Sequence, residues 1–97
     1  MTLPDLLEEL KAVDPDTWHD LILWDVNTKL PETSPISMYI IQGCIQQACE
    51  KRGWCFMVCN HIADVSTEKD IYDSEIHDYP AEALLAAYVA AVKEATR

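Results

Sequence analysis

Residues 54–60, with the sequence WCFMVCN, decide the fold of this chain. The stretch carries no formal charge and is rich in aromatic and apolar side chains, which is typical of a β-strand in a protein core. Side chains alternate between the two sides of a strand, which places Trp54, Phe56 and Val58 on one face and Cys55, Met57 and Cys59 on the other. Because both sets are apolar, we expect both faces to be covered.

The residues before this strand predict a helix over 35–52. Pro35 suits its first turn, Lys51 and Arg52 suit the negative end of its dipole, and Gly53 supplies a left-handed stop. Its apolar stripe is wide and comprises Ile36, Tyr39, Ile40, Cys44, Gln47 and Ala48, with Ile41 and Ile45 beside them. We therefore expect this helix to be the most buried in the protein.

After the strand, residues 63–69 are predicted to form a turn that leads to a weaker strand over 70–77. Apolar residues in that strand are separated by acids, which favours a position at the sheet edge. Pro80 then opens a last helix, to about Thr96, whose alanines allow close packing against a sheet.

The N-terminal third is predicted to be helical. Thr2 caps a first helix, with Asp5 three residues on, and this helix ends at Asp14, which caps a second helix beginning at Pro15. Residues 21–26, LILWDV, fit either a helix or a short strand. The predicted fold is therefore α+β, a small antiparallel sheet packed by helices (a helix–sheet–helix sandwich) in one domain over residues 1–97.

The composition of the chain excludes several classes of function. The chain has 97 residues, 49% of them hydrophobic, and a formal net charge of −10. This much apolar material argues against disorder, and the negative charge argues against direct binding of nucleic acid. The first ten residues do not resemble a signal peptide, and the longest apolar run, residues 83–92, is far shorter than the roughly 20 residues of a membrane span. We expect a cytoplasmic protein with no membrane contact.

The acids are concentrated in residues 64–82, which contain seven acidic residues and one lysine. On an edge strand and its turns they would form a negative ridge, spaced much like the phosphates of nucleic acid, that attracts a basic partner. The alternative is that the charge serves only solubility. The candidate partner-binding residues are Asp64, Glu68, Asp70, Asp73, Glu75 and Asp78.

Trp18 and Trp24 are further candidates, because they are six residues apart on the presumed helix and cannot both face one narrow core. An exposed tryptophan beside acids suits a protein contact, including self-association into a homodimer. Core packing is the alternative for each.

The cysteines and histidines are the candidate residues for a metal or catalytic site. Cys55 and Cys59 would stand roughly 13 Å apart on one strand, too far to share a zinc ion, although a Cys/His site assembled from several elements is an alternative. We expect the cysteines to be buried structural thiols and the three histidines, His19, His61 and His77, to lie at the surface. No motif for a nucleophile, a phosphate loop or a zinc protease is present, so we expect no enzyme activity and no cofactor.

Three stretches together resemble the phage ABA-sandwich domain family: DPDTWHDLILW at residues 14–24, EKRGWCFMV at 50–58 and YPAEALLAAYVAAVKEA at 79–95. The resemblance implies a helix–sheet–helix sandwich of phage origin and brings no catalytic residues. With the acidic segment, it predicts a non-enzymatic binding protein, an anti-CRISPR-like inhibitor of a host nucleic-acid-binding defence complex. The alternatives are a phage structural or assembly protein and a metal-binding protein.

Overall fold

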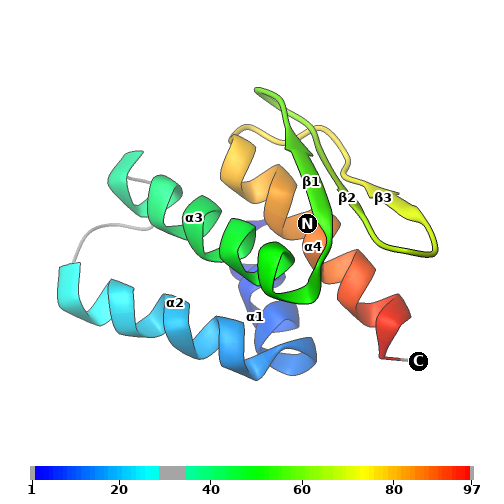
Figure 1. Ribbon diagram of the computed structural model, residues 1–97. Helices are drawn as coiled ribbons and strands as arrows, with labels where there is room; N and C mark the ends of the chain where they lie inside the picture. Colours follow the sequence, from blue (N-terminus) through cyan, green and yellow to red (C-terminus); the bar gives the residue numbers. More distant parts are fainter. Residues whose placement is uncertain (1, 29–34, 97) are drawn as a thin grey trace.

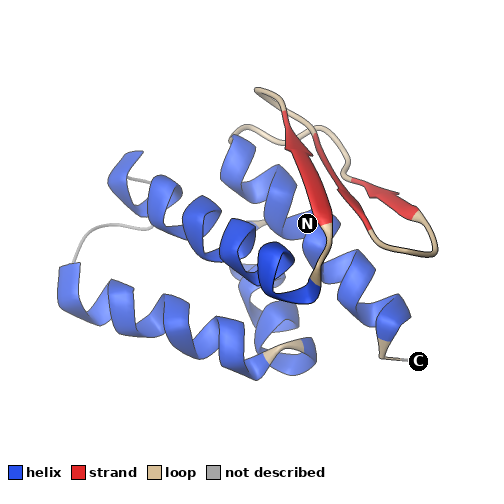
Figure 2. Cartoon of the chain, viewed as in Figure 1, coloured by secondary structure: helices blue, strands red, loops and turns tan. Residues whose placement is uncertain are grey.

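The computed structural model describes residues 2–28 and 35–96, and for 24–28 and 35–37 it describes the backbone alone. It has four helices and a three-stranded antiparallel sheet, which confirms the α+β class (Figures 1 and 2). The helices are α1 (Leu3–Val13), α2 (Pro15–Thr28), α3 (Pro35–Arg52) and α4 (Pro80–Ala95). The strands are β1 (Cys55–Val58), β2 (Ala63–Ser66) and β3 (Ile71–Asp73).

Local sequence signals set the helix boundaries. Thr2 and Asp5 form a reciprocal capping box at the start of α1. The Asp14 carboxylate accepts hydrogen bonds from the backbone N–H and hydroxyl of Thr17, which caps α2. Gly53 ends α3 with a φ of 73°, a conformation that side chains with a Cβ rarely adopt. Residues 21–26 continue α2, so the helical alternative for this segment is confirmed.

The sheet has the order β1-β2-β3, and its central strand was not predicted. Residues 63–66, expected to be a turn, form β2, which pairs with β1 through Phe56 opposite Val65. The strand predicted over residues 70–77 corresponds to β3, which is shorter and spans only Ile71–Asp73. The intervening turn over residues 67–70 closes with the Thr67 N–H donating to the Asp70 carbonyl.

Helices cover one face of the sheet. The inward side chains are buried or half-buried: Phe56, Val58, Ala63, Val65 and Tyr72. On the other face Cys55 and Met57 are exposed, so the expectation that both faces of this strand would be covered is wrong. The sheet lies at the outside of the molecule, against α4, rather than between helices (Figure 1).

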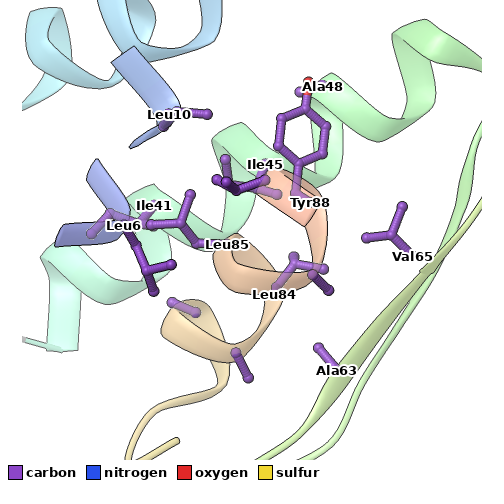
Figure 3. Packing of buried hydrophobic residues seen from close by; sticks show 14 of the residues in the cluster. Leu6, Leu10, Ile41, Ile45, Ala48, Ala63, Val65, Leu84, Leu85 and Tyr88 are labelled. Carbon is purple, nitrogen blue, oxygen red and sulfur yellow. The ribbon is translucent and has the colours of Figure 1, made fainter. Parts of the chain in front are cut away.

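The core is centred on α4, not on α3. In Figure 3, Leu84 points toward Ala63 and Val65 of β2, whereas Leu85 points toward Leu6 of α1. Both leucines are fully buried, and α4 contacts α1, α3 and all three strands. The small buried alanines of the same helix, Ala81, Ala83, Ala87 and Ala91, let it pack closely on two sides at once.

The buried face of α3 differs from the predicted stripe. Tyr39 is 73% exposed and Gln47 is exposed, although both were placed in the stripe. Among residues 38–52 of this helix, the buried ones are Met38, Ile41, Ile45, Ala48 and Cys49. Apolar and polar residues are interspersed around this helix with no clear apolar side, so periodicity alone could not fix which side meets α4.

Candidate functional site

The outer face of the sheet is the most distinctive open surface of the protein. The strand register arranges its six outward side chains in two rows that run across the sheet. One row is Cys55, Ser66 and Ile71, and the other is Met57, Asp64 and Asp73. Apolar and acidic groups therefore lie side by side on neighbouring paired strands.

Two apolar side chains on this face are well exposed, Met57 at 56% and Ile71 at 60%. Asp64 lies directly opposite Asp73 on the neighbouring strand. Like charges in that position destabilise a sheet by roughly 0.2–1 kcal/mol. A surface that tolerates this repulsion and leaves apolar anchors uncovered is suited to a cationic partner with apolar groups of its own.

The remaining predicted acids lie at the two ends of β3. Glu68 and Asp70 belong to the turn between β2 and β3, where the Asp70 carboxylate accepts the Ile71 N–H at 2.8 Å. Glu75 and Asp78 follow β3 and line a hollow with His77, Glu82 and the N-terminal residues of α1. The six candidate acids are Asp64, Glu68, Asp70, Asp73, Glu75 and Asp78, and none forms an ion pair with another described residue.

His77 corrects the expectation that the histidines lie at the surface. Its side chain is 6% exposed, and its Nδ1 lies 3.1 Å from Oε1 of Glu82. Its backbone N–H donates to the His61 carbonyl, and its own carbonyl lies 2.9 Å from the His61 ring. These hydrogen bonds connect the segment after β3 to the turn between β1 and β2. They therefore fix the position of the segment that carries Glu75 and Asp78.

A second polar cluster, built on Asp14, lies within the helical layer. Its Oδ2 accepts a 2.5 Å hydrogen bond from the buried Tyr88 hydroxyl and a 2.7 Å bond from Thr17, and it lies 3.6 Å from the Arg52 guanidinium. Arg52 also donates to the Tyr88 oxygen at 3.1 Å and lies over the Trp54 ring. The cluster joins the α1–α2 corner, the end of α3 and the middle of α4.

The protonation of this cluster follows from its contacts. Burial opposes ionisation of Asp14, but the bonds from Tyr88 and Thr17 and the charge of Arg52 outweigh it and lower the pKa of Asp14. Burial, then the bond to the Asp14 carboxylate, raises the pKa of Tyr88 to about 12. Every polar group is paired, so the cluster fixes the fold rather than presenting a reactive group.

Of the two tryptophans predicted as contact residues, Trp18 and Trp24, the side chain is described for Trp18 alone. Trp18 is half-buried against the core, and the Lys11 ammonium covers its ring at 4.8 Å from the centroid. Trp24 lies in the part of α2 for which the backbone alone is described, so the prediction for its side chain is not tested. Trp54, at 9% exposed, packs against Tyr88 with ring centroids 6.0 Å apart.

The cysteines divide into two kinds, which corrects the expectation that all are buried. Cys49 is fully buried, and burial raises its pKa to about 12. Cys44 is half-buried, whereas Cys55 and Cys59 are exposed on and just after β1. Within residues 2–28 and 35–96, no group of three or more His, Cys, Asp or Glu side chains is placed to hold a metal ion.

No protein-family model matches the sequence, and neither a curated protein nor a solved structure matches it. The resemblance to the phage ABA-sandwich family therefore stays a prediction. None of the helices in the described part of the chain is long and apolar enough to cross a membrane.

Proposed function

We propose that this protein is a non-enzymatic binding protein that docks a cationic surface of another protein on the outer face of its sheet. The observation that carries the proposal is the facing pair Asp64 and Asp73, with the exposed Met57 in the same row and the exposed Ile71 in the neighbouring row. A lysine or arginine placed between the two carboxylates would remove their repulsion and form charge-assisted hydrogen bonds.

The acids at both ends of β3 extend this surface beyond the two rows. Glu68 and Asp70 at one end and Glu75 and Asp78 at the other would raise the rate of encounter with a basic partner more than the affinity. Steering of this kind weakens as salt shortens the Debye length. The proposed partner class is a host protein whose basic groove binds nucleic acid, as expected for a phage-encoded inhibitor that mimics DNA.

A charge-reversal experiment tests the docking surface. The variant Asp64→Lys, Glu68→Lys and Asp73→Lys is compared with a control that changes the exposed Glu8, Asp20 and Glu50 of the three N-terminal helices to lysine. Both variants change the net charge equally. Titration calorimetry with a lysine- and leucine-rich peptide, at about 50 and 300 mM salt, should show loss of binding in the first variant only. Equal loss of peptide binding in both variants would show that binding depends on net charge alone, and it would reject the sheet face as the docking surface.

The identity of the partner class needs a second measurement. The immobilised protein is incubated with bacterial lysate, and bound proteins are eluted with duplex DNA. Elution of a nucleic-acid-binding protein that the sheet-face variant does not retain supports the inhibitor proposal. If the captured proteins stay bound when duplex DNA is added, nucleic-acid mimicry is rejected, and only a general protein-binding function remains supported.

A further inference from the structure

The two edges of the sheet differ in charge. Beside the outer edge of β3 lie Asp70, Asp73 and Glu75, and such charges discourage another strand from pairing there. β1 forms the opposite edge, and no charged residue occurs between Trp54 and Asn60. An uncharged apolar edge strand is a template for a further strand.

The hydrogen-bond pattern shows which groups this edge presents. The Cys59 N–H donates to the Ile62 carbonyl, which closes the hairpin between β1 and β2. Pairs alternate along an antiparallel ladder, so Cys55 and Met57 also direct their backbone groups toward β2. Phe56 and Val58 then direct their N–H and C=O groups away from the sheet. Their side chains are half-buried, and among residues 2–28 and 35–96 no strand pairs with β1 on that side.

We propose that β1 pairs antiparallel with β1 of a second copy of this chain, about a two-fold axis at Met57. In this register Phe56 of one chain lies opposite Val58 of the other, so both outward-facing residues of each strand are hydrogen-bonded. A shift of two residues toward the strand's start would require the Trp54 N–H, which already donates to the Cys49 carbonyl. A shift the other way would require Asn60, which lies in the hairpin turn.

Charge selects a second copy as the occupant. Residues 54–60 carry no carboxylate to attract a basic strand and no cation to attract an acidic one, and Arg52, over the Trp54 ring, already interacts with Asp14 and Tyr88. A neutral strand with the same outward groups is its complement. Asp64 lies opposite Met57, one strand from the axis, and the other acids lie further out, so the nearest carboxylates of the two copies are three strand spacings, roughly 14 Å, apart. That separation exceeds the Debye length at physiological salt, which limits their repulsion. A strand pair this short predicts a weak dimer that salt strengthens.

The register places two cysteines opposite each other across the interface. Cys55 of one chain lies opposite Cys59 of the other in a non-hydrogen-bonded pair, where Cα atoms are about 4.5 Å apart. Disulfides bridge Cα distances of about 4.4–6.8 Å. Oxidised glutathione would therefore link the chains: the Cys55 thiolate displaces one glutathione thiolate, and the partner's Cys59 thiolate displaces the other. The protein loses two thiol protons and two electrons, and two reduced glutathione molecules form.

Mixing two cysteine variants tests the register. With oxidised glutathione, Cys55→Ser alone and Cys59→Ser alone should form few linked dimers, because like cysteines are not opposed. An equimolar mixture restores one Cys55–Cys59 pair and should form at least about tenfold more linked dimer on a non-reducing gel. Cys44→Ser is the control and should cross-link like the unchanged protein. No gain in the mixture, or equal linking in either variant alone, overturns the register.

The association itself is measured without oxidant by sedimentation equilibrium up to about 1 mM protein. Met57→Lys places two like charges at the axis and should weaken the dimer by about tenfold or more. Ile71→Lys is the matched control, because Ile71 is equally exposed on the same face but lies on β3. A purely monomeric protein at every concentration, or equal dissociation by both lysine variants, overturns the proposal.

Discussion

Replacing Tyr88 by phenylalanine tests how much of the stability depends on one buried hydroxyl. The hydroxyl donates to the Asp14 carboxylate and accepts from Arg52, and Tyr88 is fully buried on α4. The change leaves the ring and its contact with Trp54 in place, so it removes the hydrogen bonds and little of the packing. A hydrogen bond to a charged group contributes about 1.5–3 kcal/mol. We expect the free energy of unfolding to fall by about 2 kcal/mol, a drop of roughly 10 °C in Tm.

The same variant has a distinct pH dependence. Because the pKa of Asp14 in the folded protein lies below its ordinary value of 3.8, ionised Asp14 stabilises the fold above pH 3.8, and this contribution is lost as pH falls through the folded pKa. Phenylalanine removes the hydroxyl that lowers the pKa, while burial continues to raise it. The difference between the two proteins should therefore be full near pH 7 and shrink below about pH 3.8.

Urea unfolding followed by tryptophan fluorescence, at about pH 7 and pH 2.5, measures both effects. Tyr39→Phe is the control, because Tyr39 is 73% exposed and its loss should change stability by less than about 0.5 kcal/mol. A Tyr88→Phe loss equal at both pH values would show that the Asp14 charge is not involved. A loss no larger than that of the control would refute the role of the cluster.

Three further changes address a cap, a turn and the thiols. Thr2→Ala removes the hydroxyl of the α1 capping box and should cost about 1 kcal/mol in urea unfolding, whereas Thr2→Ser should retain most of it. Gly53→Ala should cost about 1 kcal/mol from backbone strain alone, because φ is 73° and no atom lies within 4 Å of the added Cβ; an unchanged Tm would contradict this. In brief labelling with a thiol reagent near pH 8, mass spectrometry should find Cys55 and Cys59 modified but Cys49 protected, since burial raises its pKa to about 12. Equal labelling of Cys49 would show that the core opens readily.

The helix boundaries could be predicted because their signals are local. The Thr2–Asp5 capping box, the Asp14–Pro15 junction and Gly53 each act within a few residues of chain, and the structure confirms all three. The central strand could not be predicted in the same way. Residues 63–66, ADVS, have weak β-propensity and lie in an acidic stretch. They form a strand because β1 and β3 pair with them on both sides and α4 buries Val65.

The candidate site could be predicted only in part, because its geometry also depends on pairing between strands that are distant in the sequence. The acids stand out in the sequence, but their opposition depends on the register that puts Asp64 beside Asp73. Alternation correctly placed Cys55 and Met57 on one face, yet it could not show that no helix covers that face. His77 had no local mark of burial, since its contacts come from His61 and Glu82.

The proposed docking surface and the proposed dimer interface lie on the same sheet but depend on different residues. Docking of a basic partner depends on the carboxylates of β2 and β3, whereas pairing of two copies depends on the uncharged edge of β1. The Cys55→Ser and Cys59→Ser variants keep every carboxylate, so they should bind the basic peptide unchanged while losing the cross-link. The Asp64, Glu68 and Asp73 reversal keeps β1 intact and should still form the linked dimer. Loss of both properties in either variant would mean that the sheet itself had rearranged, because neither set of substitutions reaches the other surface directly.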